Sequence, residues 1–185
     1  MVYLPILPPA ESGLERLFRV PIRLCKAVAP HLRDDCRVIL SREFEIKTGG
    51  CLDAFDVTEE VEDTVTRSGV THGSVLVFSP HTTCCVVVGP GGTEIADSLQ
   101  ATLDRIEAED GYYAHDDLSI RTENLVEDEP ANAPAHILHA VVGKTSECIP
   151  VVEGRVVLGD EQRVLFVELD ASRPRRYLIQ VLGER

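Results

Sequence analysis

The sequence lacks the features that mark membrane, secreted and nucleic-acid-binding proteins. No apolar run approaches the roughly 20 residues that a membrane-spanning helix requires. The first ten residues carry three prolines and no basic residue, unlike a secretory signal peptide. Lys and Arg number 18 against 31 Asp and Glu, so the chain has no basic excess to neutralise a phosphate backbone. We therefore expect a soluble, cytoplasmic protein that binds neither membranes nor nucleic acid.

The usual signatures of cysteine and serine chemistry are also absent. The six cysteines form no C-x-x-C pair, which argues against a structural zinc knuckle, and no G-x-S-x-G elbow frames a serine nucleophile. Only Cys84 and Cys85, in the stretch SPHTTCCVVV, lie beside a histidine, His81. Strand alternation would place Cys85 on the same face as His81 and Cys84 on the other face. Core packing is the favoured interpretation of both cysteines, and a catalytic thiol is the alternative.

Charge and proline content divide the chain near residue 40. Residues 1–40 hold six Lys and Arg, four Asp and Glu, and five of the 11 prolines, whereas residues 41–185 hold 12 basic and 27 acidic residues. A chain of 185 residues suffices for one full hydrophobic core. We expect an N-terminal extension, 1–40, and one domain, 41–185, and we hypothesise that the extension covers a cleft of this acidic domain.

Hydrophobic periodicity predicts an α+β domain with mixed or antiparallel β-sheets and two or three helices. The expected helices are 59–68, which Gly69 ends, a helix after Thr93 that reaches Ile106, and 133–142, which Asn132 caps. The expected strands are 42–48, 74–79, 83–88, 148–152, 156–158, 164–169 and 177–182. The last turn carries three arginines around Pro174: Arg173, Arg175 and Arg176.

Three histidines lie at the edges of these elements. His81 begins a strand, His115 lies in an acidic loop next to Asp116, and His136 falls in the first turns of a short helix. Neutral imidazoles held by carboxylates are common metal ligands, and Asp116 or its neighbour Asp117 could orient His115. From spacing alone, ordinary surface or core histidines remain the alternative. The loop itself, with nine acids and one base over residues 107–129, is also typical of a solvated segment.

The ordered set of motifs resembles the YjbQ-like proteins, also called the secondary thiamine-phosphate synthase family. The resemblance covers about residues 41–184 and is carried by SGVTHGSVLVFSPHTT, YYAHDD, NAPAHI, VVGKTSECIPVVEGRVVLG, EQRVLFVELD and RPRRYLIQVLGE. It implies a single compact α+β domain, a homotrimer, and histidines near a surface cleft with a divalent metal ion, Zn or Mg. It also implies a transferase that joins a pyrimidine diphosphate to a thiazole phosphate. The alternative is a non-catalytic trimeric relative that binds a small-molecule ligand or a metal.

The resemblance assigns roles to individual positions. The implied catalytic residues are His81, His115, Asp116 and His136, and the three histidines are also the implied metal ligands. The implied substrate-binding residues are Thr82, Thr83, Asn132 and Gln162, and Glu168 matches an acid of the strand that follows Gln162. Three places depart from the family pattern: Gly89-Pro90 replaces Asn-Glu, Leu138 replaces a lysine, and Glu161 replaces a tryptophan.

Overall fold

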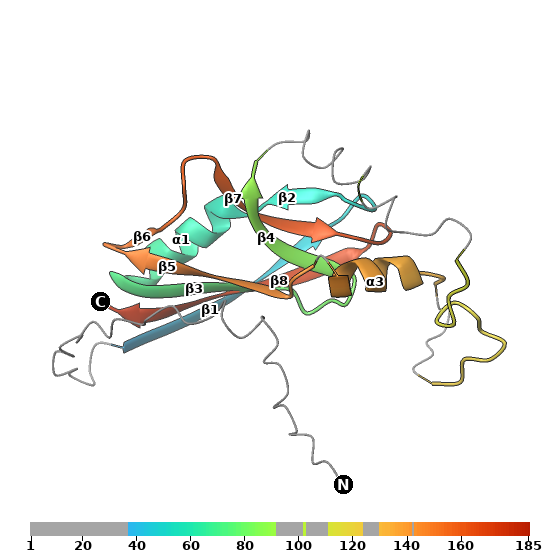
Figure 1. Cartoon of the computed structure of the whole chain (residues 1–185). Coiled ribbons are helices and arrows are strands. Elements are labelled where there is room, and N and C mark those ends of the chain that lie inside the picture. The colour runs from blue at the N-terminus through green and yellow to red at the C-terminus, as the bar shows by residue number, and fades with distance from the viewer. Residues whose placement is uncertain (1–36, 92–101, 103–110, 124–129, 142) are drawn as a thin grey trace, which may run out of the picture. The chain divides into compact units, whose positions relative to one another are not determined.

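The helices and strands of the described residues belong to one compact unit, residues 33–185 (Figure 1). The computed structural model describes residues 37–91, 102, 111–123, 130–141 and 143–185. In chain order the elements are β1 (Arg37–Lys47), β2 (Ala54–Asp56), α1 (Thr58–Ser68), β3 (His72–Phe78), β4 (Cys84–Pro90), α3 (Ala133–Val141), β5 (Ser146–Val152), β6 (Arg155–Val156), β7 (Gln162–Glu168) and β8 (Pro174–Glu184).

The strands form two sheets. The first sheet has the order β1-β8-β3-β5-β6 and the second has the order β2-β7-β4. Every pairing among the described strands is antiparallel. Strand β1 pairs with β8 along its whole length, from Arg37 opposite Glu184 to Lys47 opposite Pro174. The expected α+β class with antiparallel sheets is confirmed.

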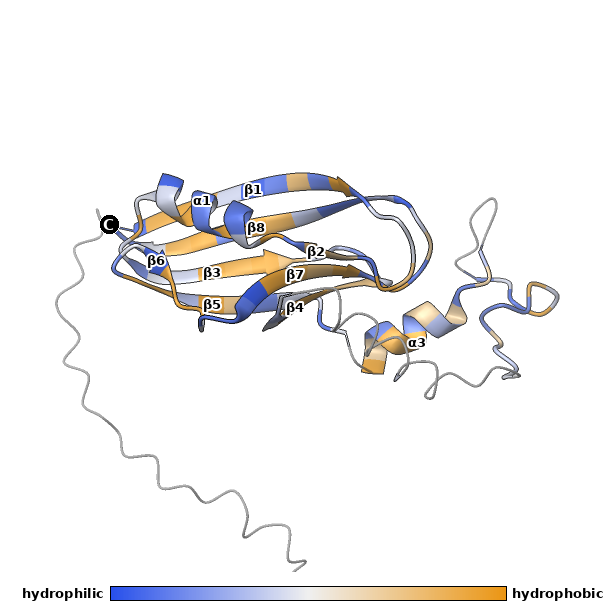
Figure 2. Ribbon diagram, turned by 90° about the horizontal axis from the view of Figure 1, so that it is seen from above, coloured by the Kyte–Doolittle hydropathy of each residue, from blue (hydrophilic) through white to orange (hydrophobic). Residues whose placement is uncertain are grey.

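The main core lies between the inner face of the first sheet and the layer made by α1 and the second sheet. The first sheet contributes alternate residues such as Val75, Ile179 and Val181, which are fully buried. Phe166 of β7 and Val61 of α1 meet them from the opposite side. Hydrophobic residues are visible along β3, β5 and β8 in Figure 2. Period-two burial in the strands therefore places one face of this sheet against the core.

A second, smaller core lies between the second sheet and α3. Its buried members are Leu52, Cys85, Ala135, Leu138, Val167 and Leu169. Strand β4 serves both cores, because Cys84 and Val86 face the main core while Cys85 faces α3. The small core fixes the position of α3 on the outer side of the second sheet.

Helix α1 follows the amphipathic pattern of its sequence. Val61 and Val65 face the main core, and Glu59 and Glu60 lie in the first turn, where acids favour the helix dipole. Gly69 ends the helix in the left-handed conformation with φ 68°, as the sequence predicts. The helix begins after Val57, and Asp56 Oδ1 accepts the Thr58 N–H at 3.0 Å.

Two glycines let β3 and β8 approach closely. Gly73 and Gly183 are direct cross-strand partners. A Cβ added at Gly73 would collide with the Leu182 carbonyl oxygen and the Gly183 Cα, and one added at Gly183 would collide with the His72 carbonyl oxygen. The absence of both side chains therefore sets the local spacing of the sheet.

Most of the expected elements are present, with some differences at their ends. Strand β1 begins at Arg37, so residues 37–40 belong to the sheet and not to the expected extension. Arg175 and Arg176 lie in β8 and not in a turn. The three-residue strand β2 is absent from the elements expected from the sequence. The helix expected after Thr93 and the hypothesis about the extension concern residues outside the described ones, apart from Thr102.

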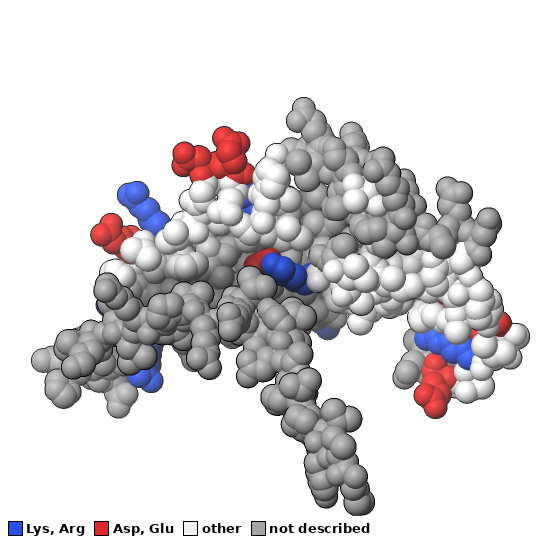
Figure 3. Space-filling model, viewed as in Figure 1, with Lys and Arg blue, Asp and Glu red and all other residues white. Residues whose placement is uncertain are grey.

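None of the helices among the described residues is both long and apolar enough to span a bilayer. On the face drawn in Figure 3, the described Lys and Arg side chains lie apart from one another, several of them close to acidic side chains. Salt bridges pair Arg42 and Arg67 with Asp63 on α1.

Candidate functional site

The structure brings together His115 and His136, which are 21 positions apart in the chain. Their ring centroids are 4.8 Å apart and the planes are tilted by 48°. His115 lies in the loop 111–123, and His136 lies in the first turn of α3. Both side chains are half-buried. These two candidate residues therefore share one site.

Asp116 organises this site through one carboxylate oxygen. Its Oδ1 accepts hydrogen bonds from His115 Nδ1 at 2.9 Å, from the Asn132 N–H at 3.1 Å and from the Ala133 N–H at 3.0 Å. Burial opposes the charged form, but the bonds from His115 and Ala133 outweigh it and lower the pKa of the Asp116 carboxyl. Asp116 thus fixes the His115 ring and accepts the N–H groups at the start of α3. The expected cap was the side chain of Asn132, which bonds Asp170 in the structure.

His136 is held from the opposite side by the β3–β4 turn. The Thr82 backbone hydrogen-bonds the His136 ring and acts to raise its pKa, as a carbonyl acceptor does. Burial and then the neighbouring His115 dominate, so the pKa of His136 is lower than that of an ordinary histidine. His136 is therefore a neutral imidazole at pH 7, with one ring nitrogen engaged.

His81 lies in the same β3–β4 turn but makes a different contact. The Arg176 N–H, at the start of β8, donates to His81 Nε2 at 3.1 Å. Burial and then the Arg175 charge lower the pKa of His81. The acceptor nitrogen of the neutral ring is therefore already occupied by protein. The described residues contain no group of three or more His, Cys, Asp or Glu side chains that could hold a metal ion.

Asn132 connects the start of α3 to the end of β7. Its Nδ2 donates to Asp170 Oδ2 at 2.8 Å, and Asp170 also pairs with Arg173 at 2.8 Å. The Asn132 side chain is buried and its Oδ1 has no hydrogen-bond partner. The Asn132 side chain therefore joins the start of α3 to the end of β7 inside the protein.

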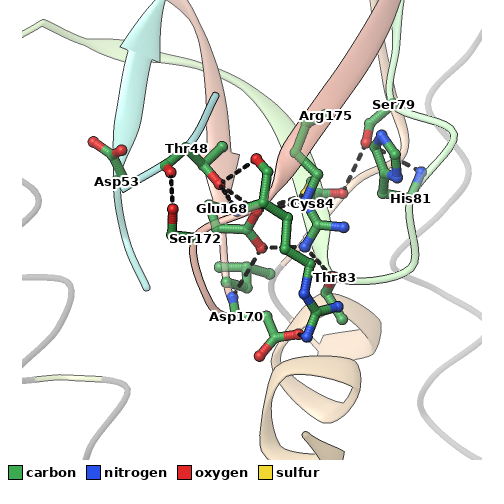
Figure 4. Close-up of polar contacts among 12 residues, drawn as sticks. Thr48, Asp53, Ser79, His81, Thr83, Cys84, Glu168, Asp170, Ser172 and Arg175 are labelled. Atoms are coloured by element: carbon green, nitrogen blue, oxygen red, sulfur yellow. Dashed lines mark hydrogen bonds and ion pairs between the residues drawn. The ribbon is translucent and has the colours of Figure 1, made fainter. Parts of the chain in front are cut away.

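A buried ion pair lies beneath the β3–β4 turn (Figure 4). Arg175 Nε donates to Glu168 Oε2 at 2.6 Å, and Arg175 Nη2 donates to Glu168 Oε1 at 2.8 Å. Glu168 is completely buried and Arg175 is 9% exposed. Arg175 also donates to Thr83 Oγ1 at 3.0 Å. The sequence showed an acid in a strand and an arginine near a proline, but their pairing depends on the register of β7 and β8.

The remaining substrate-binding candidates lie in different places. Thr82 and Thr83 belong to the β3–β4 turn, beside His81. Gln162 begins β7, whereas Glu168 ends it, so at about 3.3 Å per residue the two lie about 20 Å apart along the strand. The Gln162 side chain accepts the Gly159 N–H at 2.9 Å and lines a separate cavity of about 400 Å³ with Glu59 and Arg163. Within one chain, Gln162 therefore does not join the histidines.

The two cysteines beside His81 have the properties of core residues. Cys84 and Cys85 are 0% and 3% exposed. Burial raises the pKa of Cys84 to about 12 and that of Cys85 to about 11. At neutral pH both are thiols, and the thiolate is the nucleophilic form. The geometry thus favours the core interpretation of this pair.

Comparison with known proteins gives one consistent family. The sequence matches the family described as "UPF0047 protein YjbQ-like" over residues 42–184. A UPF0047 protein of Archaeoglobus fulgidus is 31% identical over 141 residues, which cover 76% of this chain and 99% of that protein. The UPF0047 protein YugU of Bacillus subtilis is 30% identical over 142 residues, which cover 77% of this chain and 98% of that protein.

Solved structures agree with the sequence comparison. A YbjQ-like protein of unknown function from Sulfolobus solfataricus P2 has a TM-score of 0.68 and 26% identity, over 80% of this chain and 99% of that one. A hypothetical protein from Aeropyrum pernix K1 has a TM-score of 0.66 and 32% identity, over 78% of this chain and 99% of that one. The chain therefore belongs to the YjbQ-like UPF0047 family.

Proposed function

We propose that this chain is a metal-dependent enzyme whose centre is built on the His115–His136 pair. The observation that carries the proposal is the way in which the two rings are held. Asp116 engages His115 Nδ1, and the Thr82 backbone engages the ring of His136. Metal-binding histidines commonly donate their second ring nitrogen to a carboxylate or a backbone carbonyl.

The two rings would supply two nitrogen ligands to a divalent ion, and its other positions would be taken by water, substrate or groups beyond this pair. With Nδ1 of His115 bonded to Asp116, its Nε2 remains for a ligand, and His136 keeps one ring nitrogen. Imidazole suits Zn²⁺ better than Mg²⁺, which prefers oxygen ligands. Of the two expected ions, zinc is therefore the better fit. We do not include His81 among the ligands, because the Arg176 N–H occupies its Nε2.

The proposed reaction class is group transfer between phosphorylated substrates, as the family resemblance implies. A divalent ion at this site would supply Lewis-acid stabilisation of a phosphate oxygen. The protein residues have separate tasks: His115 and His136 hold the ion, and Asp116 keeps the His115 Nδ1–H pointed away from it.

Metal titration of the full chain tests this proposal. After removal of metals with a chelator, calorimetry with Zn²⁺ should show one ion per chain, and His115→Ala or His136→Ala should weaken binding at least tenfold. His72→Ala is the matched control, because His72 is an exposed histidine at the other end of β3. Absence of binding by the wild-type chain, or equal binding by all variants, would refute the proposal.

A non-catalytic relative that binds a metal or a small ligand is the second candidate, and one observation favours it. Leu138, at the place of the family lysine, is 4% exposed and packs in the small core with Cys85 and Ala135. This position therefore presents no ammonium to a phosphate. Complementation of a thiamine-requiring strain, lost in the His136→Ala variant, would rule out this second candidate and support the transferase.

We further propose that the chain forms a homotrimer, as the resemblance implies. Ile39 and Leu182 are cross-strand partners on the outer face of the first sheet, and they are 70% and 47% exposed. Exposed apolar neighbours of this kind are typical of protein interfaces. Light scattering on the full chain should give the mass of three subunits, and Ile39→Glu should lower it. A monomeric wild-type chain would contradict this assembly.

A further inference from the structure

We infer that the buried Glu168–Arg175 pair is the positioning element of the histidine site. The pair holds the Pro80–Thr83 turn against the start of β8, and thereby sets the contacts of His81 and His136. This inference rests on the proposed metal centre for its effect on binding, but its structural part can be tested without metal.

The pair receives contacts from three other segments of the chain. In addition to Arg175, the Glu168 carboxylate accepts Thr48 Oγ1 at 3.0 Å, the Asp170 N–H at 3.0 Å and Cys84 Sγ at 3.5 Å. Thr48 follows β1, Cys84 begins β4, and Asp170 follows β7 (Figure 4). Both Glu168 oxygens are therefore engaged by protein donors, as a fully buried carboxylate requires.

One branch of this network reaches the turn that carries His81. Arg175 donates to Thr83 Oγ1 at 3.0 Å, while the next residue, Arg176, donates its N–H to His81 Nε2 at 3.1 Å. Two consecutive residues of β8 thus hold both sides of Thr82. Because the Thr82 backbone contacts the His136 ring, the position of the turn is passed on to α3.

A second branch reaches α3 from the end of β7. Glu168 Oε1 accepts the Asp170 N–H, and Asp170 Oδ2 accepts Asn132 Nδ2 at 2.8 Å. The Asn132 N–H then donates to Asp116, which orients His115. His115 is therefore connected to the ion pair through a series of hydrogen bonds, and His136 is connected to it through the backbone of the Thr82–Thr83 turn.

A bidentate arginine–carboxylate pair suits this role because its planar geometry allows little rotation. Residues that are hydrogen-bonded directly to metal ligands typically change metal affinity by about 10- to 100-fold when they are replaced, and this pair acts at least one contact further away. We therefore expect the pair to act on the site through geometry, although neither of its side chains would contact the ion.

Two readouts on the full chain test the inference. The main variant is the double replacement Glu168→Leu with Arg175→Met, which leaves no unpaired buried charge. Zn²⁺ affinity, measured by calorimetry, should fall about tenfold, the lower end of the effect of residues bonded directly to the ligands. In the metal-free protein, ¹⁵N NMR should show His81 as the Nδ1–H tautomer in the wild type, because Nε2 accepts a hydrogen bond. In the double variant, both the Nδ1–H and the Nε2–H tautomers of His81 should be populated.

Tyr177→Phe is the matched control, since Tyr177 is buried two residues further along β8 and contacts the rings of Phe44 and Phe166. It should leave both readouts unchanged. Arg175→Lys keeps the charge without the fork and should give intermediate values; it also replaces the double variant if that protein does not fold. A folded variant with the wild-type tautomer and wild-type zinc affinity would overturn the inference. If the wild-type chain binds no zinc, the proposed function fails, and the tautomer alone decides the positioning role.

Discussion

Replacement of Asp116 by alanine should loosen α3 and the His115 ring together. Asp116 Oδ1 accepts the N–H groups of Asn132 and Ala133, 16 and 17 residues away, and it also accepts His115 Nδ1. A distant loop residue thus does the work that an N-cap side chain does in most helices. Asp116→Ala removes all three contacts at once.

The size of the effect follows from two contributions. Loss of a capping acceptor costs about 0.5–2 kcal/mol of helix stability. Loss of a negative charge at the helix N-terminus costs about 0.3–1 kcal/mol more. The opening free energy of α3 should therefore fall by about 1–3 kcal/mol, which corresponds to about 5- to 150-fold faster amide exchange in that helix.

Hydrogen exchange of the α3 amides, followed by mass spectrometry, measures this effect. Asp117→Ala is the control, because Asp117 bonds Tyr112 and Ser119 of its own loop. It removes the same charge from the adjacent position and should leave α3 protected. Equal exchange of α3 in the two variants would show that the Asp116 contacts do not stabilise the helix.

Three further predictions concern stability. Arg175→Met alone should lower the free energy of unfolding in urea by about 3–5 kcal/mol, because Glu168 would remain buried without its partner. The double replacement with Glu168→Leu should recover most of this loss. An equal loss in the two variants would contradict the prediction. Gly73→Ala should cost about 1–3 kcal/mol or more, because the new Cβ meets the backbone of β8, while Gly89→Ala, with 3.7 Å to Val87 Cγ1, should be nearly neutral. His81 and His136 have a lower pKa in the folded chain than when unfolded, so the unfolded chain binds more protons just below pH 6.5. The free energy of unfolding should thus be highest above that pH and should decrease as the pH drops below it. In urea titrations between pH 7 and 5, a variant with both histidines replaced by Gln should show a smaller decrease in this free energy.

Local patterns predicted the elements that bury one regular face. The alternation of Phe44 and Ile46 predicted β1, and Gly69 predicted the end of α1. Strand β2 was not predicted, because three residues carry no periodic signal and the strand forms by pairing with β7. Asn132 has the residue type of an N-cap, but its side chain donates to Asp170, and a carboxylate from a distant loop binds the N–H groups of Asn132 and Ala133.

The site was predictable in part for the same reason. Motif order and residue type pointed to His115, Asp116 and His136, and the structure brings these three together. Gln162 looked equivalent by motif, but it begins the strand that Glu168 ends. The Glu168–Arg175 pair had no sequence signal, because a buried ion pair forms only when two strands and their register are fixed.

Proteolysis of α3 can report whether the site is occupied, because a small core holds this helix on the second sheet. Only Ala135 and Leu138 of α3 are among its buried members, so we expect this helix to detach by local unfolding well before the sheets separate. His136 would leave with it. A ligand that binds only the attached state raises the cost of that detachment by RT ln(1 + [L]/Kd). Protease cleavage within α3 should therefore slow in proportion to the filled fraction of the site, while cleavage of the sheets stays unchanged.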